Sequence, residues 1–244
     1  MAPGHATAGP LASGARFQLH PIRRAAGCMT LQIQSPPESL PIDPLPPARG
    51  LLAAFARGVL KLAGWTVEFP GLPGTHGIVI VYPHTSNWDF VVGLLAKWSV
   101  GVPFSFVGKE SLFRGFTGAT LGRLMRAWGG MPVNRHDASG AVEQIAAMMQ
   151  ARPWCWLGIS PEGTRAYRDT LRSGFYFLAL RLDLPVGLGY LDFASRRIGC
   201  TRFVRMSGDV HRDLALLRDA YRATTGKRPE QASRIDFRED LTRD

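Results

Sequence analysis

The stretch IVIVYPHTSNWD, residues 78–89, decides the fold, because it runs from a buried strand through a turn into a helix. Residues 78–82 are apolar and mostly β-branched, as expected of a strand covered on both faces of a sheet. The next segment predicts a helix over 87–98, with Ser86 and Asp89 spaced as in a capping box. A strand that leads directly into a helix is typical of layered α/β domains.

The same alternation of strands and helices continues toward the C-terminus. Hydrophobic patterning predicts strands at 104–107, 131–133 and 154–159, and helices near 119–128, 142–149, 175–182 and 214–221. Two further strands, 185–193 and 198–206, are expected to form a hairpin that turns at residues 195–197. We therefore predict an α/β fold: a single layered domain, residues 67–225, with a mixed, largely parallel central sheet flanked by helices. Residues 226–244 are interpreted as a polar C-terminal tail.

The N-terminal part has a different composition. Residues 1–50 are rich in Pro, Gly, Ala and Ser without apolar periodicity, which indicates a flexible leader, with Met29 as a possible true start. Residues 51–66 predict an amphipathic helix that precedes the domain. Its apolar side chains fall within a stripe of roughly 100°: Leu51, Leu52, Phe55, Val59 and Leu62. The stripe either packs on its own domain or lies in a membrane interface, with Trp65 near the headgroups.

Size and charge narrow the function classes. A chain of 244 residues can hold one sizeable core. It has 29 Lys and Arg against 19 Asp and Glu, a formal net charge of +10, which favours anionic partners. We expect no nucleic-acid partner, because the sequence has no recognised nucleic-acid module. No window of about 18 uncharged apolar residues exists, so a membrane-spanning helix is not expected.

The first candidate for chemistry is His84 with Asp89, placed where a strand ends and a helix begins. Open α/β sheets keep their sites at the carboxyl ends of strands. A histidine titrates near neutral pH and can take a proton from a hydroxyl, and a carboxylate can fix its tautomer and stabilise the imidazolium. If His84 lies in the turn and Asp89 in the first helical turn, the two side chains can face each other. The alternative is that Asp89 only caps the helix.

The second candidate is the run PEGTR at 161–165, which also follows a strand. Glycine lets the backbone approach a ligand closely, threonine supplies a hydroxyl, and the planar guanidinium of Arg165 suits phosphate. A charged turn that caps the next helix would have a similar sequence. Lys109 and Arg135 follow two other predicted strands, where solvated surface charge is the alternative interpretation.

Together these motifs resemble those of the glycerophospholipid acyltransferase family, and most closely its 1-acyl-sn-glycerol-3-phosphate acyltransferase (lysophosphatidate acyltransferase) members. The resemblance covers about residues 65–195: H-x4-D at 84–89, GKE at 108–110, a strand before Arg135, and PEGTR at 161–165. It implies that His84 is the general base and Asp89 its orienting carboxylate. It also assigns substrate binding to Lys109, Arg135, Glu162, Gly163, Thr164, Arg165 and Arg172. The sequence departs from the family pattern at Pro83, Ala166 and Gly187.

The resemblance implies an O-acyltransferase of phospholipid biosynthesis. It would take a fatty acyl group from acyl-CoA or acyl carrier protein to a lysophospholipid hydroxyl, with no cofactor and no metal. Its expected partners include an anionic membrane surface, which suggests a peripheral location at the cytoplasmic face of a bacterial inner membrane. Three alternatives remain: transfer to another lysolipid, such as a lyso-aminolipid; a non-catalytic basic membrane-binding protein; and a serine hydrolase. The hydrolase needs G-x-S-x-G, and the nearest run, residues 158–162, fails at its last position.

Overall fold

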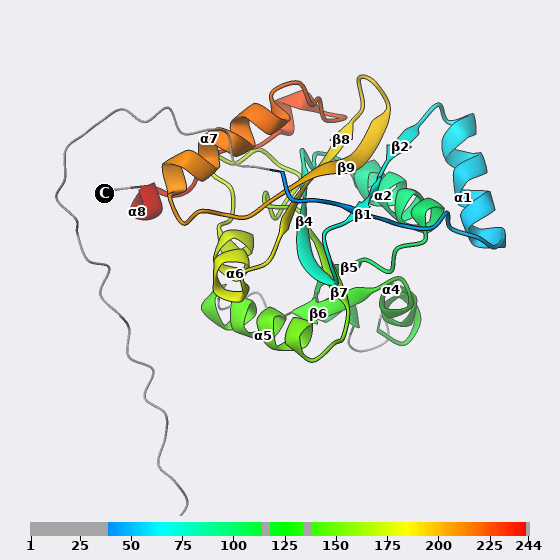
Figure 1. The fold of residues 1–244 in the computed structure, drawn as a ribbon, viewed down its shortest axis with the longest axis horizontal. Helices are drawn as coiled ribbons and strands as arrows, with labels where there is room; N and C mark the ends of the chain where they lie inside the picture. Colours follow the sequence, from blue (N-terminus) through cyan, green and yellow to red (C-terminus); the bar gives the residue numbers. More distant parts are fainter. Residues whose placement is uncertain (1–38, 114–117, 134–137, 243–244) are drawn as a thin grey trace, which may run out of the picture. The chain divides into compact units, whose positions relative to one another are not determined.

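The computed structural model describes residues 39–113, 118–133 and 138–242. A seven-stranded sheet, in the order β2-β9-β8-β4-β7-β5-β6, forms the centre of the domain (Figure 1). All neighbouring strands are parallel except β8 and β9. The predicted mixed, largely parallel sheet is therefore confirmed. Its strands are β2 (Thr66–Glu68), β4 (His76–Tyr82), β5 (Ser105–Lys109), β6 (Gly130–Val133), β7 (Cys155–Ile159), β8 (Val186–Asp192) and β9 (Arg197–Val204).

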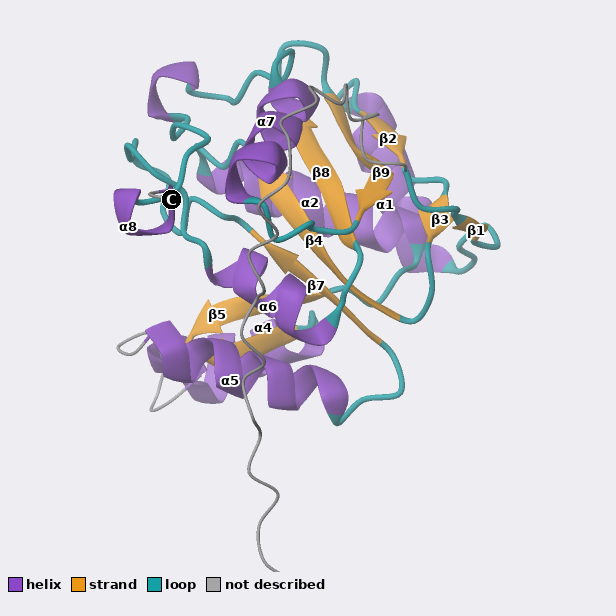
Figure 2. Ribbon diagram, turned by 60° about the vertical axis from the view of Figure 1, so that its left-hand side comes forward, coloured by secondary structure: helices purple, strands orange, loops and turns teal. Residues whose placement is uncertain are grey.

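Helices cover both faces of this sheet (Figure 2). One face of β4, with Ile78 and Ile80, packs in the main core against α5 (Ala138–Gln150), α6 (Gly174–Leu182) and α7 (Val210–Tyr221). On the other face lie α1 (Leu51–Leu62) and α2 (Asn87–Val100). Alternate side chains of a strand point to opposite faces, so an uninterrupted apolar run supplies both layers. The remaining elements are short: α4 (Arg123–Ala127), α8 (Glu239–Thr242), 3₁₀ turns at Glu110–Phe113 and Pro229–Gln231, and a π turn at Gly118–Gly122.

The end of the predicted leader belongs to the domain. β1 (Asp43–Pro44) pairs antiparallel with β3 (Gly71–Leu72), and the Leu40 N–H donates to the Phe203 carbonyl at 2.8 Å. Leu40 and Ile42 also pack against a second apolar cluster. The prediction of a leader is therefore wrong for residues 39–50, because isolated apolar side chains between prolines show no period. Residues 1–38 lie outside the described residues.

Helix α1 is amphipathic, as predicted, but its expected stripe is not the face that packs. Ala53, Ala56 and Leu60 are buried, whereas the side chains of the stripe are largely exposed: Leu51 91%, Leu52 53%, Phe55 62% and Leu62 91%. The helix also ends at Leu62 and not at residue 66, because Gly64 has a φ of +73° and the chain then enters β2. None of the described helices is long and apolar enough to span a bilayer.

The segment predicted as a polar tail packs on the domain through residue 237. Phe237 is 3% exposed and Ser233 1%, and Phe237 lies against Phe175 and Tyr176 with ring centroids 6.1 and 5.3 Å away. The tail prediction is thus corrected for residues 226–237, which we call the C-terminal strap. Its few apolar side chains stand among arginines without helical or strand spacing, so no sequence pattern indicates burial.

Candidate active site

The two predicted motifs lie on loops that follow neighbouring strands. β4 and β7 are parallel and in register from His76↔Cys155 to Ile80↔Ile159. The H-x4-D loop follows β4 and the PEGTR loop follows β7, so both leave the same edge of the sheet. This edge, at the carboxyl ends of the strands, is where open α/β sheets place their ligands.

His84 and Asp89 face each other at the start of α2. The Nδ1 atom of His84 lies 3.1 Å from Oδ2 of Asp89, and the two side chains are 24% and 2% exposed. The same carboxylate oxygen accepts the backbone N–H of Ser86 at 2.8 Å, and the Ser86 side chain accepts the N–H of Trp88. The capping box and the histidine–carboxylate pair therefore coexist. With Nδ1 donating to the carboxylate, the lone pair of the neutral ring lies on Nε2.

Glu162 lies beneath the H-x4-D loop and is fully buried. Its carboxylate accepts the backbone N–H of His84 through Oε2 and that of Ser233, at 2.8 Å, through Oε1. Burial raises the pKa of Glu162, and the hydrogen bonds to its carboxylate oppose that rise. The resemblance assigns Glu162 to substrate binding, but here its side chain contacts the protein and fixes the position of His84.

The rest of the PEGTR loop presents its cations outward. Gly163 has a φ of +66°, and a Cβ there would lie 2.6 Å from Cδ of Arg172, so a side chain would be strained and crowded. The Oγ1 atom of Thr164 accepts the N–H of Ala166 within the loop. The side chains of Arg165 and Arg172 are exposed. Arg165 and Arg172, like Arg168 between them, are therefore cations that an anionic ligand can reach.

For the two other predicted cations, the structure describes the backbone of Lys109 but not Arg135. Lys109 ends β5, which pairs with β7, so its backbone lies at the same sheet edge as His84. Arg135 lies outside the described residues, two positions after β6 ends. The structure therefore brings together His84, Asp89 and the residues of the PEGTR loop, and it places the strand of Lys109 two positions away from β4 in the sheet.

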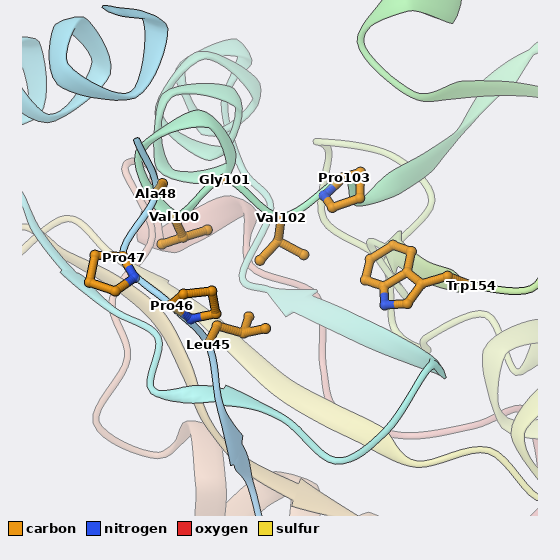
Figure 3. Close-up of a pocket in the computed structure, with 9 residues that line it drawn as sticks. All are labelled: Leu45, Pro46, Pro47, Ala48, Val100, Gly101, Val102, Pro103 and Trp154. Atoms are coloured by element: carbon orange, nitrogen blue, oxygen red, sulfur yellow. The ribbon is translucent and has the colours of Figure 1, made fainter. Parts of the chain in front are cut away.

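A separate apolar hollow of about 350 Å³ lies at the other edge of the sheet (Figure 3). Its walls include the segment 45–48 and the side chains of Val102, three residues before β5, and Trp154, directly before β7. His84 follows the opposite end of the parallel strand β4. The hollow is therefore not the place where His84 could meet a substrate.

Sequence reasoning missed the strap residues that contact the two motif loops. The backbone of Ser233 reaches Glu162, the backbone N–H of Arg228 donates to Oγ1 of Thr85 at 3.1 Å, and Tyr82 donates to the Ser233 carbonyl at 2.7 Å. Burial, with a smaller contribution from the Glu162 charge, raises the pKa of Tyr82 to about 12, so its hydroxyl remains a donor at neutral pH. Most of these contacts use backbone groups, for which a sequence gives no signal.

A family model described as acyltransferase matches residues 66–187, which include both motif loops. A search of curated proteins found no match. Among solved structures, the crystal structure of the 1-acyl-sn-glycerophosphate (LPA) acyltransferase PlsC from Thermotoga maritima is similar, with a TM-score of 0.45 and 14% identity. The similarity covers 72% of this chain and 80% of that one.

Proposed function

Since the chain belongs to the acyltransferase family, we propose that it transfers a fatty acyl group from a thioester donor to the hydroxyl of a lysophospholipid-type acceptor such as 1-acylglycerol-3-phosphate. The observation that carries the proposal is the pairing of His84 with a buried Asp89, 3.1 Å apart, at the same sheet edge as the exposed Arg165. A base next to a cationic site suits an acceptor that combines a hydroxyl with a phosphate.

The proposed reaction is a direct transfer. Nε2 of His84 takes the proton of the acceptor hydroxyl as its oxygen attacks the carbonyl carbon of the thioester. The carbon–sulfur bond then breaks, and the proton passes from His84 to the leaving thiolate of coenzyme A or acyl carrier protein. Asp89 stabilises the imidazolium that forms between these steps. A positioned base of this kind contributes roughly 100- to 10,000-fold to the rate.

The acceptor's anionic end is proposed to bind at Arg165, with help from Arg172. Arginine forms paired hydrogen bonds with phosphate oxygens, and these bonds are stronger than neutral ones. Lys109 and Arg135 remain further candidates for this role.

The acceptor is a lipid, so we also propose that the protein works at the cytoplasmic face of the membrane. The exposed apolar stripe of α1, with Leu51, Phe55 and Leu62, suits insertion into the interface, and the net charge of +10 suits anionic headgroups. None of the residues that the structure describes covers Leu51, Phe55 or Leu62, which favours the interfacial interpretation of α1 over packing on the protein's own core.

The test is incubation of the purified protein with labelled acyl-CoA or acyl carrier protein and a panel of lysolipids that includes lysophosphatidate. We expect the label to move to a phosphate-bearing lysolipid, and His84→Ala to abolish transfer while its circular dichroism spectrum stays unchanged. Transfer only to a lysolipid without phosphate would refute the proposed acceptor. Equal turnover by His84→Ala would refute the proposed base.

A further inference from the structure

The C-terminal strap, residues 226–237, lies outside the region matched by the family, 66–187, yet it contacts both motif loops. Gly226 and Arg228 lie against Thr85, the residue after His84. A Cβ at Gly226 would lie 2.8 Å from Oγ1 of Thr85, so the strap runs directly over the catalytic loop. Thr85 itself is 1% exposed.

The strap also pairs with the PEGTR loop and the segment after it. Apart from the bond between Ser233 and Glu162, the N–H of Arg234 donates to the carbonyl of Arg168 at 3.0 Å, and the N–H of Leu171 donates to the carbonyl of Asp236 at 2.7 Å. These backbone hydrogen bonds, the buried ring of Phe237, the ion pair of Asp236 with Arg218 and the contact of Lys227 with the Trp88 ring hold the strap in place without Gln231.

One side chain of the strap touches both loops at once. The side-chain amide of Gln231 faces two carbonyl oxygens, and this assigns its nitrogen to that side: the nitrogen then donates to the carbonyl of Arg165 at 2.8 Å and to that of Thr85 at 3.0 Å. A primary amide has two N–H donors, so it can satisfy both carbonyls together. Gln231 thus links the backbone of the proposed phosphate-binding arginine to the backbone beside His84.

We propose that Gln231 is a positioning residue that sets the separation of His84 from Arg165, and with it the alignment of the acceptor hydroxyl on the base. The proposal rests on the proposed function, because it assigns the acceptor to Arg165. Two observations indicate a role in positioning the substrate and not only in stabilising the fold. The backbone hydrogen bonds and Phe237 anchor the strap without Gln231. The two carbonyls that Gln231 contacts belong to the two loops whose spacing the acceptor must match.

The first test compares Gln231→Leu with Glu230→Ala, a control in the same 3₁₀ turn whose side chain is exposed. A misplacement of about 1 Å can cost on the order of 100-fold in rate. We expect Gln231→Leu to lower kcat/KM for the acceptor by about 10- to 100-fold through both kcat and KM. The donor KM and the melting temperature should stay close to those of Glu230→Ala. Equal kinetics in the two variants would overturn the proposal.

The second test is Gln231→Glu, which keeps the size of the side chain and serves if Gln231→Leu does not fold. A carboxylate cannot donate to the two carbonyls, whereas a protonated carboxyl can donate to one. The activity of this variant relative to wild type should therefore rise as the pH falls from about 8 to about 5.5, since a carboxyl between two carbonyl oxygens has a pKa above its usual value of about 4.3. A relative activity independent of pH would contradict the proposed hydrogen bonds.

Hydrogen exchange separates this proposal from the proposed function. Peptides covering residues 83–89 and 160–172 should exchange faster in Gln231→Leu than in Glu230→Ala, whatever the substrate is. Unchanged exchange in both peptides would overturn the link between the loops. Failure of wild type and Glu230→Ala to transfer acyl groups to any lysolipid would instead overturn the proposed function.

Discussion

Asp89→Asn tests the proposed chemistry more finely than removal of the histidine. Oδ2 of Asp89 accepts from both the Ser86 N–H and Nδ1 of His84. In the asparagine variant the amide oxygen should take this place, because an NH2 group there would face the Ser86 N–H. The neutral tautomer of His84 and the helix cap should therefore be retained. The negative charge is lost, and the NH2 group takes the place of Oδ1, which is buried without a hydrogen-bond partner among the described residues.

The magnitude follows from the distance between the two groups. Unit charges 3.1 Å apart interact with about 5 kcal/mol at an effective dielectric constant of about 20. If about half of the imidazolium charge has developed in the transition state, the variant loses about 2.7 kcal/mol, or roughly 100-fold in kcat. This loss should be smaller than that of His84→Ala, which removes the base itself.

The assay is single-turnover acyl transfer at saturating acceptor, with unfolding followed in parallel by circular dichroism. A variant that is still folded at the assay temperature, with kcat reduced by about 100-fold, is the expected result. A folded Asp89→Asn protein with kcat within about threefold of wild type would show that the carboxylate stabilises no charge during the reaction. The pair would then be a helix cap alone.

Three further measurements address other parts of the molecule. Arg165→Ala should raise the acceptor KM by about 10- to 100-fold, which corresponds to the loss of a hydrogen bond to a charged group, and should change the donor KM little. A change confined to the donor KM would assign the PEGTR loop to donor binding. Phe55→Asp should weaken sedimentation with anionic vesicles more than Ala54→Asp does, because it removes apolar surface as well as adding charge; equal binding would place the membrane contact elsewhere. Hydrogen bonds from Tyr190 and Arg197 lower the pKa of Glu68, so its stabilisation is present above the unfolded pKa and lost as pH falls through the folded one. Glu68→Gln should lower the melting temperature at pH 7 and have a smaller effect below about pH 4; a pH-independent difference would contradict this.

The sequence predicted those helices and strands whose hydrophobic side chains recur at regular helical or strand spacing. β4, β7 and α2 were recognisable because their apolar runs are long and their ends carry proline or a capping box. The hairpin of β8 and β9 was also predicted, although its strands are shorter than expected. Strand β2, three residues long, was missed because so short a segment shows no alternation.

The candidate site could be predicted only in part. His84, Asp89 and Arg165 follow from residue chemistry at strand ends, and the structure places their loops on adjacent strands. The role of Glu162 did not follow, because the family resemblance assigned it to substrate binding, whereas here each of its carboxylate oxygens accepts a backbone N–H. Gln231 carried no signal, since its contacts are with carbonyl groups that every residue has.

The strap also determines when the site is completed during synthesis. The bonds that close the strap over the catalytic loop join residues 151 and 143 positions apart, Tyr82 to Ser233 and Thr85 to Arg228. A ribosome that adds about 5–20 residues per second needs roughly 7–30 s to make the intervening chain, and contacts between such distant residues also form slowly during folding. The His84 loop therefore cannot form its last contacts until residues 226–237 have been translated. A nascent chain that stops short of them would carry both sequence motifs without the spacing that Gln231 sets between them.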